Sequence, residues 1–301
     1  MFDRLILPED LVDARGEVIA ARGVVLSPES IADAAAAARP GPRIPLADTG
    51  LAADVAAPLH DHAYRHLFPD GGTKDAVRRA ILAIRLPSAL FEELLALRRA
   101  ASPIHGHAFA TSAVAVRMLF SVVGEARGVP ELAAAALLHD LGMRFLPPRL
   151  GRLRERLGDD EALRVAAHPF VGAYHLARVL GEHPAVSAAL GHHWRCGQGY
   201  PNLRAEPTRS MEVVAVASAF AALTQPRPFR SAAYDARGAA DVLVSEAIEG
   251  QADANTVKLL VHALRGGAGD PRAIRFGRER GGHGPDVNRH AHVAVPARSH
   301  V

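Results

Sequence analysis

The stretch that decides the fold is residues 130–142, which read Pro-Glu-Leu-Ala-Ala-Ala-Ala-Leu-Leu-His-Asp-Leu-Gly. Pro130 suits the first turn of a helix, and the run of alanine and leucine is a strong helix former. The run closes with His139 and Asp140. An imidazole beside a carboxylate at the buried end of a helix is costly unless a cation compensates, and both groups are good ligands for Fe, Mn or Zn. The alternative for this pair alone is one hydrogen-bonded histidine and an aspartate that caps the next turn.

Motifs upstream and downstream favour the metal interpretation. His107 lies upstream, at the start of a helical stretch that continues to about residue 119. The downstream motifs are, in chain order, His168-Pro169, His192-His193, Gly199-Tyr200-Pro201 and Leu223-Thr-Gln-Pro-Arg227-Pro-Phe-Arg230. One such motif is a weak signal, whereas six in one order along the chain are a strong one.

Together these motifs resemble the HD-GYP family, metal-dependent phosphodiesterases of the HD superfamily that hydrolyse the bacterial second messenger cyclic di-GMP. The resemblance extends from about Leu86 to Leu264. It implies a mainly α fold, in which an HD-type helical bundle follows a small α+β N-terminal module. A helical bundle with ligands facing inward from several helices is a plausible way to build such a site.

The resemblance also implies a site for two divalent ions, Fe or Mn, bridged by Asp140. Two ions of this kind polarise a phosphodiester and supply a hydroxide for in-line attack, so Asp140 is the expected catalytic residue. The implied ligands are His107 and His139 for one ion, and His168, His192 and His193 for the other. Adjacent residues point about 100° apart on an ideal helix, so the His192-His193 pair can ligate together only where the helix ends. Gly197 and Gly199 supply that break.

Two arginines and one loop have implied binding roles. Arg227 and Arg230 match family positions that contact substrate phosphate, which guanidinium geometry suits. Judged alone, they are equally well explained as solvent-facing arginines in a proline-rich turn. The family's Gly-Tyr-Pro loop is implied to contact another signalling protein, and here it consists of Gly199, Tyr200 and Pro201.

The sequence departs from the family pattern at the metal and phosphate positions. Met143 stands where the family has a lysine, and Arg144 is the candidate substitute. Ser218 stands where the family has a later metal-binding aspartate. A hydroxyl is a far poorer ligand than a carboxylate, so we expect the ion shared by His107 and His139 to bind less tightly.

Further departures surround the histidine pair. Trp194 and Cys196 replace two acidic residues, and this stretch is one residue shorter than the family pattern. Placing the gap in the loop keeps both histidines as ligands, whereas the other register would put Gly191 in one ligand position. Cys196 could ligate instead, although one cysteine beside a histidine cluster is more often passive. Pro103 stands where some members carry a glutamate for a third ion, so no third ion is expected.

Two functions are therefore compatible with the sequence. The first is a phosphodiesterase for cyclic di-GMP or a related cyclic dinucleotide, weakened by the lost aspartate and lysine. The second is a degenerate domain that serves as a cyclic dinucleotide sensor or a protein-docking module in bacterial signalling. Loss of both groups would cost orders of magnitude in rate, since a few kcal/mol correspond to about a hundredfold.

Composition limits the location and the partners. The 301 residues contain one cysteine, which excludes an intrachain disulfide and suits a reducing cytoplasm. The first residues lack the pattern of a secretory signal, and no uninterrupted apolar run is long enough to span a bilayer. The net charge of +3 is too small to indicate a nucleic acid partner. A homodimer is a further expectation, although no apolar stripe identifies its surface.

Three regions are predicted along the chain. Residues 1–70 form the α+β module, with a hairpin turned at Gly16, a short strand at 24–26 and a helix from Ser27 to Ala38. Residues 73–264 form the helical domain, and residues 265–301 a largely disordered tail. The helices expected are 75–86, 88–100, one opened by Ser102-Pro103, those that carry the histidines, and 208–224, 232–248 and 254–264. A cluster of His60, His62 and His66 is expected to be a polar surface rather than a metal site.

Overall fold

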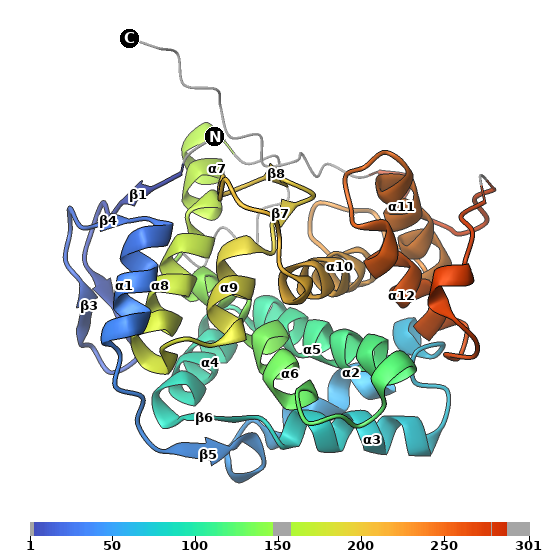
Figure 1. Ribbon diagram of the computed structural model, residues 1–301, viewed down its shortest axis with the longest axis horizontal. Helices are drawn as coiled ribbons and strands as arrows, with labels where there is room; N and C mark the ends of the chain where they lie inside the picture. The colour runs from blue at the N-terminus through green and yellow to red at the C-terminus, as the bar shows by residue number, and fades with distance from the viewer. Residues whose placement is uncertain (1–2, 147–157, 278, 288–301) are drawn as a thin grey trace.

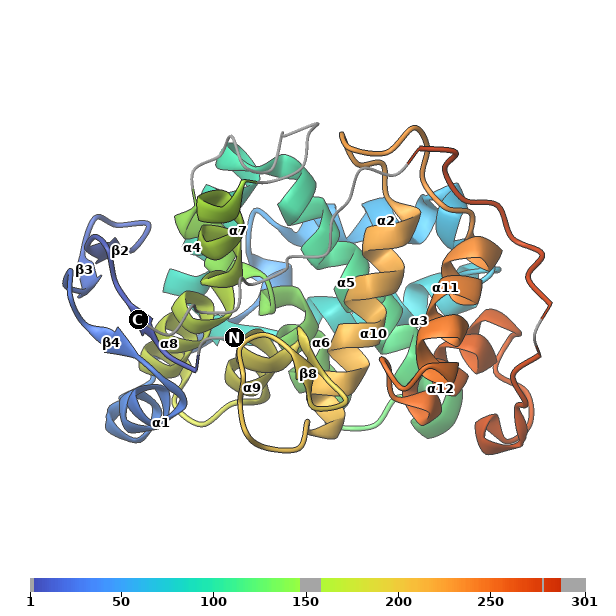
Figure 2. The same ribbon diagram turned by 90° about the horizontal axis from the view of Figure 1, so that it is seen from above.

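The computed structural model describes residues 3–146, 158–277 and 279–287. Figures 1 and 2 show a helical bundle built around α5 (Ser102–Val123), which packs against α6 (Val129–Leu138) and α10 (Arg209–Thr224). The mainly α fold class with a small N-terminal strand module is thereby confirmed. The surrounding helices are α2 (Ala56–His60), α3 (Gly71–Leu82), α4 (Ser88–Ala100), α7 (Asp159–Ala166), α8 (His168–Leu180), α9 (Pro184–Gly191), α11 (Ala236–Ile248) and α12 (Ala254–Leu264).

Helix α5 forms the centre of the core. It begins at Ser102-Pro103 as predicted, and small side chains at Ala108, Ala110 and Ala113 let neighbouring helices approach closely. By length and composition alone α5 could cross a membrane, but 67% of its apolar stretch is buried inside the protein. The burial matches a core helix of a globular bundle, and the same helix presents His107 to its neighbours.

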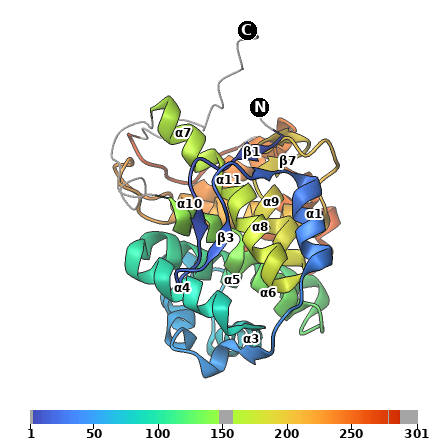
Figure 3. The ribbon, with the colours of Figure 1, turned by 90° about the vertical axis from the view of Figure 1, so that its left-hand side faces the viewer.

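The N-terminal module contains two short strand pairs and one helix. The predicted hairpin is confirmed, since β2 (Leu11–Val12) pairs with β3 (Val18–Ala20) around Gly16, which has a φ of +87°. Strand β4 (Val25–Leu26) pairs with β1 (Leu5–Ile6), a partner that the sequence did not reveal. Helix α1 (Pro28–Ala37) begins at the predicted Ser27 cap, whose hydroxyl accepts from the Ser30 N–H. Figure 3 shows this module against α8, with which α1 is in contact.

Two predicted helix boundaries were wrong. The helix expected to reach residue 86 ends at Leu82, because Arg85–Pro87 form strand β6 and pair with β5 (Arg43–Pro45). The helix expected from residue 232 begins at Ala236, where the Asp235 carboxylate caps it by accepting from the Gly238 N–H. The connecting segment between β5 and α3 consists of short turns (η1, Leu46–Asp48; η2, Ala52–Val55; η3, His62–Tyr64) and α2.

Part of the predicted tail is described. Residues 265–277 and 279–287 follow α12, and the Gly281 and Gly282 N–H groups donate to Asp241 Oδ2 on α11 at 2.9 and 3.1 Å. Residues 278 and 288–301 lie outside the described residues, so the prediction for them stays a prediction.

Candidate metal centre

The His-Asp pair lies where α6 ends. Leu138 is the last residue of the helix, His139 caps it, and Asp140 leads into the tight turn η4 (Leu141–Phe145). His139 is fully buried, and its Nδ1 donates to the carbonyl of Ala136 at 2.7 Å. The alanine-rich helix thus delivers both side chains into the middle of the bundle rather than to its surface.

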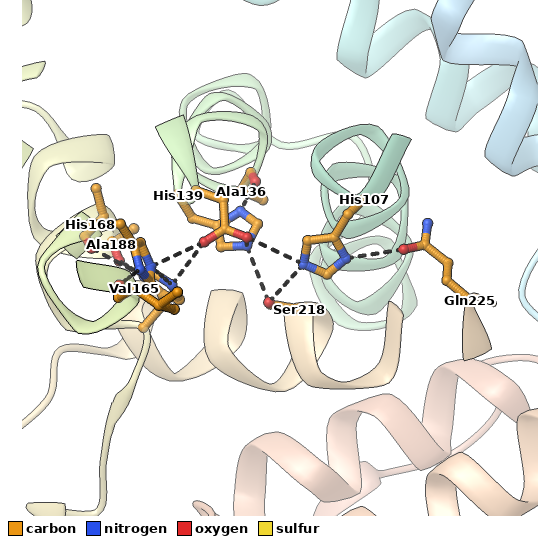
Figure 4. A network of polar contacts seen from close by, with 11 residues as sticks. His107, Ala136, His139, Val165, His168, Ala188, Ser218 and Gln225 are labelled. Atoms are coloured by element: carbon orange, nitrogen blue, oxygen red, sulfur yellow. Dashed lines mark hydrogen bonds and ion pairs between the residues drawn. The ribbon is translucent and has the colours of Figure 1, made fainter. Parts of the chain in front are cut away.

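Four histidines from separate elements converge on the Asp140 carboxylate (Figure 4). His168 comes from the start of α8, His192 from the end of α9, and His107 from α5. Asp140 Oδ1 lies 3.2 Å from Nε2 of both His168 and His192. Asp140 Oδ2 lies 3.5 Å from Nε2 of His139 and 3.7 Å from Nε2 of His107. The carboxylate therefore divides its two oxygens between two groups of imidazoles.

The six residues predicted as ligands form two sets that share Asp140. Within each set, one donor atom per residue lies within 4.8 Å of every other. The first set is Asp140, His168, His192 and His193, and the second is His107, His139 and Asp140. The sequence thus predicted both the membership and the grouping, while the role of these residues as ligands stays a prediction.

The outer nitrogen, Nδ1, of several histidines at the site contacts an oxygen atom that orients the ring. Nδ1 of His168 lies 2.6 Å from the Val165 carbonyl, and Nδ1 of His192 lies 3.1 Å from the Ala188 carbonyl. His107 Nδ1 lies 3.2 Å from Gln225 Oε1. An oxygen of this kind only accepts, so Nδ1 carries a proton, and in the neutral ring the inward Nε2 then carries a lone pair. Metal-binding histidines are oriented in the same manner by their outer nitrogen.

The close approach of these nitrogen atoms to the Asp140 carboxylate is more favourable when a cation is bound between them. Nε2 of His168 and Nε2 of His192 lie 3.2 Å apart, and both face the same carboxylate oxygen. Neutral rings with inward lone pairs would repel the carboxylate at these distances, so a positive charge, either a proton or a metal ion, must lie among these atoms. The imidazole and carboxylate donor set is the one preferred by Fe, Mn and Zn. The residues present therefore fit a divalent ion.

The ionisation states agree with this fit. Burial, helped by the nearby Arg227 guanidinium, lowers the pKa of His107 to about 3. Burial also lowers the pKa of His139 to about 4 and that of His193 well below its usual value. Burial alone would raise the pKa of Asp140, but the surrounding imidazoles outweigh it and hold that pKa well below its usual value. At neutral pH His107, His139 and His193 are thus neutral, and Asp140 is ionised.

The histidine pair follows the predicted break in its helix. α9 ends at Gly191, so His192 and His193 both turn toward the site. The His193 ring stacks on Tyr200, with 4.5 Å between centroids and 20° between planes. Gly199 makes this stack feasible, because its φ is +103° and a Cβ there would lie 1.9 Å from the His193 carbonyl oxygen. Pro201 is buried, and the partner role of this loop stays a prediction.

Ser218 occupies the side of the site where the family pattern has an aspartate. Its Oγ lies 3.2 Å from His107 Nε2 and 3.1 Å from His139 Nε2 (Figure 4). A hydroxyl has one proton, so it can donate to only one of these nitrogens at a time. The second set therefore has Asp140 as its single carboxylate, with a hydroxyl at the position where the family pattern has another. Cys196 belongs to neither set found among the described residues.

The two predicted phosphate-binding arginines differ in their surroundings. The Arg227 guanidinium is half-buried near Asp140 and His107, and within the described residues it makes no hydrogen bond or ion pair. Burial lowers the pKa of Arg227 and Asp140 opposes that effect. Arg230 instead donates to the carbonyls of Ala222 and Leu223 at 2.8 and 3.3 Å, at the C-terminal end of α10. Arg227 is thus the better placed of the two for a substrate phosphate.

Arg144 does not take over the role of the missing lysine. Its guanidinium forms an ion pair with Glu93 at 2.6 Å and stacks on Phe145 with 4.7 Å to the ring centroid. Its charge is thus engaged by Glu93, and a role for Arg144 in place of the lysine stays a prediction. Gln225, which orients His107, is not among the predicted site residues. Its position directly after Thr224 in the Leu-Thr motif was the available signal.

Three histidines near the end of the N-terminal module lie on the surface. His60, His62 and His66 are exposed, and His62 lies in the short turn η3 rather than on a continuous helix. Within the parts of the chain that the structure describes, they belong to no group with metal-binding spacing.

Part of this chain is similar in sequence to a known bacterial phosphodiesterase. The chain is 32% identical over 102 residues to the 3′3′-cGAMP-specific phosphodiesterase 1 of Vibrio cholerae serotype O1, a match that covers 33% of this chain and 24% of that relative. The chain thus matches about a quarter of the length of this curated relative.

Two solved structures of the HD domain of the phosphodiesterase PgpH from L. monocytogenes are also similar. One aligns at 13% identity with a TM-score of 0.42, over 58% of this chain and 95% of that domain. The other, in complex with cyclic-di-AMP, aligns at 14% identity with a TM-score of 0.43, over 62% and 99%. The family model of the HD domain matches residues 90–256, which is more than half of the chain and includes every predicted metal ligand. The chain belongs to the HD domain family.

Proposed function

We propose that this chain is a metal-dependent phosphodiesterase that hydrolyses a cyclic dinucleotide, with cyclic di-GMP as the first candidate. The observation that carries the proposal is the convergence of Nε2 of His168, Nε2 of His192 and their partner imidazoles on an ionised Asp140. Such a set is stable when it holds a cation. The activity named for the Vibrio cholerae relative supports a cyclic dinucleotide as the substrate class.

Asp140, His168, His192 and His193 would hold the more tightly bound ion, and His107, His139 and Asp140 the weaker one. Iron or manganese would supply Lewis acidity toward a phosphodiester and lower the pKa of a water molecule. Asp140 stays ionised at neutral pH, so it serves both sets at once. The carbonyls behind the imidazoles accept from Nδ1 and so keep each Nε2 pointed inward, where it could bind an ion.

Arg227 would bind the substrate phosphate. Its guanidinium lies near Asp140 and has no hydrogen-bond partner among the described residues, so a phosphodiester oxygen would supply the acceptor that it lacks. Arg230 would act indirectly, since it fixes the end of α10 that precedes Arg227. A cytoplasmic location fits a second-messenger substrate, and contacts through the Gly199–Pro201 loop or a homodimer are further proposals from the family resemblance.

A second candidate function rests on Ser218. Its hydroxyl replaces an anionic ligand and contacts both His107 and His139. A site weakened in this way could bind a cyclic dinucleotide without turning it over, as a sensor or a docking module would. The two functions differ in whether the bound ligand is converted.

Product analysis tests the proposal. Anaerobically purified protein is incubated with cyclic di-GMP and, separately, 3′3′-cGAMP in the presence of Mn²⁺ or Fe²⁺, and linear products are separated by chromatography. We expect turnover that falls by at least about a hundredfold in Asp140→Asn, because both metal sets lose their anionic ligand. His62→Ala, which changes an exposed histidine outside the site, is the matched control.

The two outcomes that contradict enzymatic function can be told apart. Binding of a cyclic dinucleotide with no linear product under either metal would support the sensor function. The absence of both binding and product would exclude a phosphodiesterase and a cyclic dinucleotide sensor alike.

A further inference from the structure

Glu93 is a buried carboxylate outside the metal centre. It lies on α4 and is 1% exposed. Its Oε1 accepts from the Ala14 N–H at 2.7 Å, and its Oε2 lies 2.6 Å from Arg144 Nε, an ion pair by distance rather than an aligned hydrogen bond. His175 Nε2, on α8, lies 3.5 Å from Oε1. The buried Glu93 carboxylate joins three separate elements firmly, because moving any of them away would leave this charge without one of its partners.

The first of these elements is the N-terminal hairpin, residues 11–20. Its backbone is held at two points, since Ala14 N–H donates to Glu93 and the Val12 carbonyl accepts from Arg144 Nη1 at 3.2 Å. Arg178 on α8 also donates to the Ile19 carbonyl. Figure 3 shows the hairpin strands lying over α4 and α8. Charged side chains of the helical domain thus hold the backbone of the hairpin.

The second element leads directly to the metal centre. Arg144 belongs to η4, the turn that begins immediately after Asp140. Gly142 in this turn touches the first turn of α8, where a Cβ would lie 2.0 Å from the His168 carbonyl oxygen and 2.9 Å from the Gly172 nitrogen. Such close backbone contact leaves η4 no room to shift without moving α8 as well. A displacement at Arg144 would therefore reach both Asp140 and His168.

We propose that Glu93 and Arg144 are positioning residues that couple docking of the N-terminal hairpin to the geometry of the metal centre. The proposal rests on the proposed function, because it assumes that Asp140 and His168 bind an ion. With the hairpin docked, Glu93 holds Arg144 and hence η4 against α8. With the hairpin released, Glu93 loses the Ala14 N–H and Arg144 loses the Val12 carbonyl, so the ion pair is held less firmly and the ligands lose their fixed spacing. Coupling of this kind is reciprocal, so a bound ion must in turn favour the docked hairpin.

The test follows both directions of the coupling in the full chain. Mn²⁺ affinity is measured by titration calorimetry, and amide hydrogen exchange of residues 11–20 is measured with and without Mn²⁺. In the wild type, we expect Mn²⁺ to slow exchange in the hairpin. In Glu93→Gln, we expect this protection to disappear and Mn²⁺ affinity to fall by about tenfold, the lower end of the range for outer-shell partners.

The neighbouring residue gives a matched control. Glu92 binds Arg15 of the same hairpin at 2.6 Å, but this pair is exposed and includes no residue of η4. Glu92→Gln should therefore leave Mn²⁺ affinity and Mn²⁺-dependent protection unchanged. If Glu93→Gln does not fold, the double variant Glu93→Gln, Arg144→Gln replaces both charges with amides that can bond to each other, and the same loss of coupling is expected.

Each alternative result has a separate meaning. Mn²⁺ binding without protection of residues 11–20 overturns the coupling alone. The same holds if wild-type affinity persists in both Glu93 variants. Absence of Mn²⁺ binding in the wild type overturns the proposed function and the coupling with it.

Discussion

At the scale of single residues, the metal centre depends on two side chains with opposite effects. Asp140 divides its oxygens between two groups of histidines and so serves both. Ser218 sits between His107 and His139 with a neutral hydroxyl that can donate one proton. The first group is complete with four donors, while the second has three. The ions should accordingly differ in affinity.

The substitution Ser218→Asp tests this asymmetry. A carboxylate there would supply an anionic ligand to His107 and His139, so metal content should rise from near one toward two ions per chain. Metal analysis by mass spectrometry on anaerobically purified protein measures the change, with Ser218→Ala as the control of similar size. Unchanged occupancy in Ser218→Asp would refute the alignment of Ser218 with the family aspartate.

Most of the residues at the site could be predicted from the sequence, because imidazole and carboxylate chemistry is encoded locally in short motifs. His107, Asp140 and the histidine pair were all brought together as expected. The stack of Tyr200 on His193 and the contact of Gln225 with His107 could not be predicted. The stack depends on the exact fold of the short loop between residues 193 and 200, and the Gln225 contact depends on how segments 118 residues apart meet.

At the scale of helices, α9 owes its position to an unusual cap. His183 precedes Pro184 at the start of the helix, and its Nδ1 accepts from the Ala185 N–H at 3.0 Å. An imidazole can accept in this way only while it is neutral. Burial, with the charge of Arg43 nearby, lowers the pKa of His183 to about 4. His192 directly follows the last residue of this helix, so the cap at its start helps to hold His192 in place.

A pH dependence follows from the His183 cap. In the unfolded chain its pKa is about 6.5, so between roughly pH 6.5 and 4 the unfolded state binds a proton that the folded state does not. The free energy of unfolding should therefore fall as the pH drops through this window. In His183→Asn, which keeps a capping oxygen without a charge change, the loss between pH 7 and 4.5 should be smaller by about 2 kcal/mol. Urea unfolding at both pH values measures it, and equal losses in the two proteins would exclude this role.

Helices could be predicted well where their caps are local. The cap at Ser27 was predicted, and the helices predicted to start at 208 and 254 also begin beside a capping side chain that accepts from an N–H three residues later. The missed elements were strands of two or three residues, such as β5 with β6, whose partners lie about forty residues apart. Pairs this short have little pattern of their own, and distant packing decides them.

At the scale of the whole molecule, the ligands cross-link the bundle. They come from α5, the end of α6, the start of α8 and the end of α9, so an ion would tie together elements spread from residue 107 to residue 193. An ion bound only by the folded state stabilises it by mass action. The family fold could be predicted because these motifs keep their order along the chain.

Metal removal should consequently lower the melting temperature. Mn²⁺ at a hundred times its dissociation constant adds about 2.7 kcal/mol of stability. For a chain of this length that corresponds to roughly 5 °C in Tm. Differential scanning calorimetry with Mn²⁺ and with a chelator measures the shift, and Asp140→Asn should show almost none. Identical melting of the wild type in both conditions would argue against a site that binds only the folded chain.

The central helix α5 has a consequence for biosynthesis. Its apolar faces are covered partly by α10, which ends about one hundred residues later in the chain. At the usual speed of translation, that interval lasts on the order of 5–20 s. During this interval the nascent polypeptide exposes an apolar segment that resembles a membrane-spanning helix in length and composition. Efficient production should therefore depend on chaperones at the ribosome exit, and slow translation before α10 should favour aggregation.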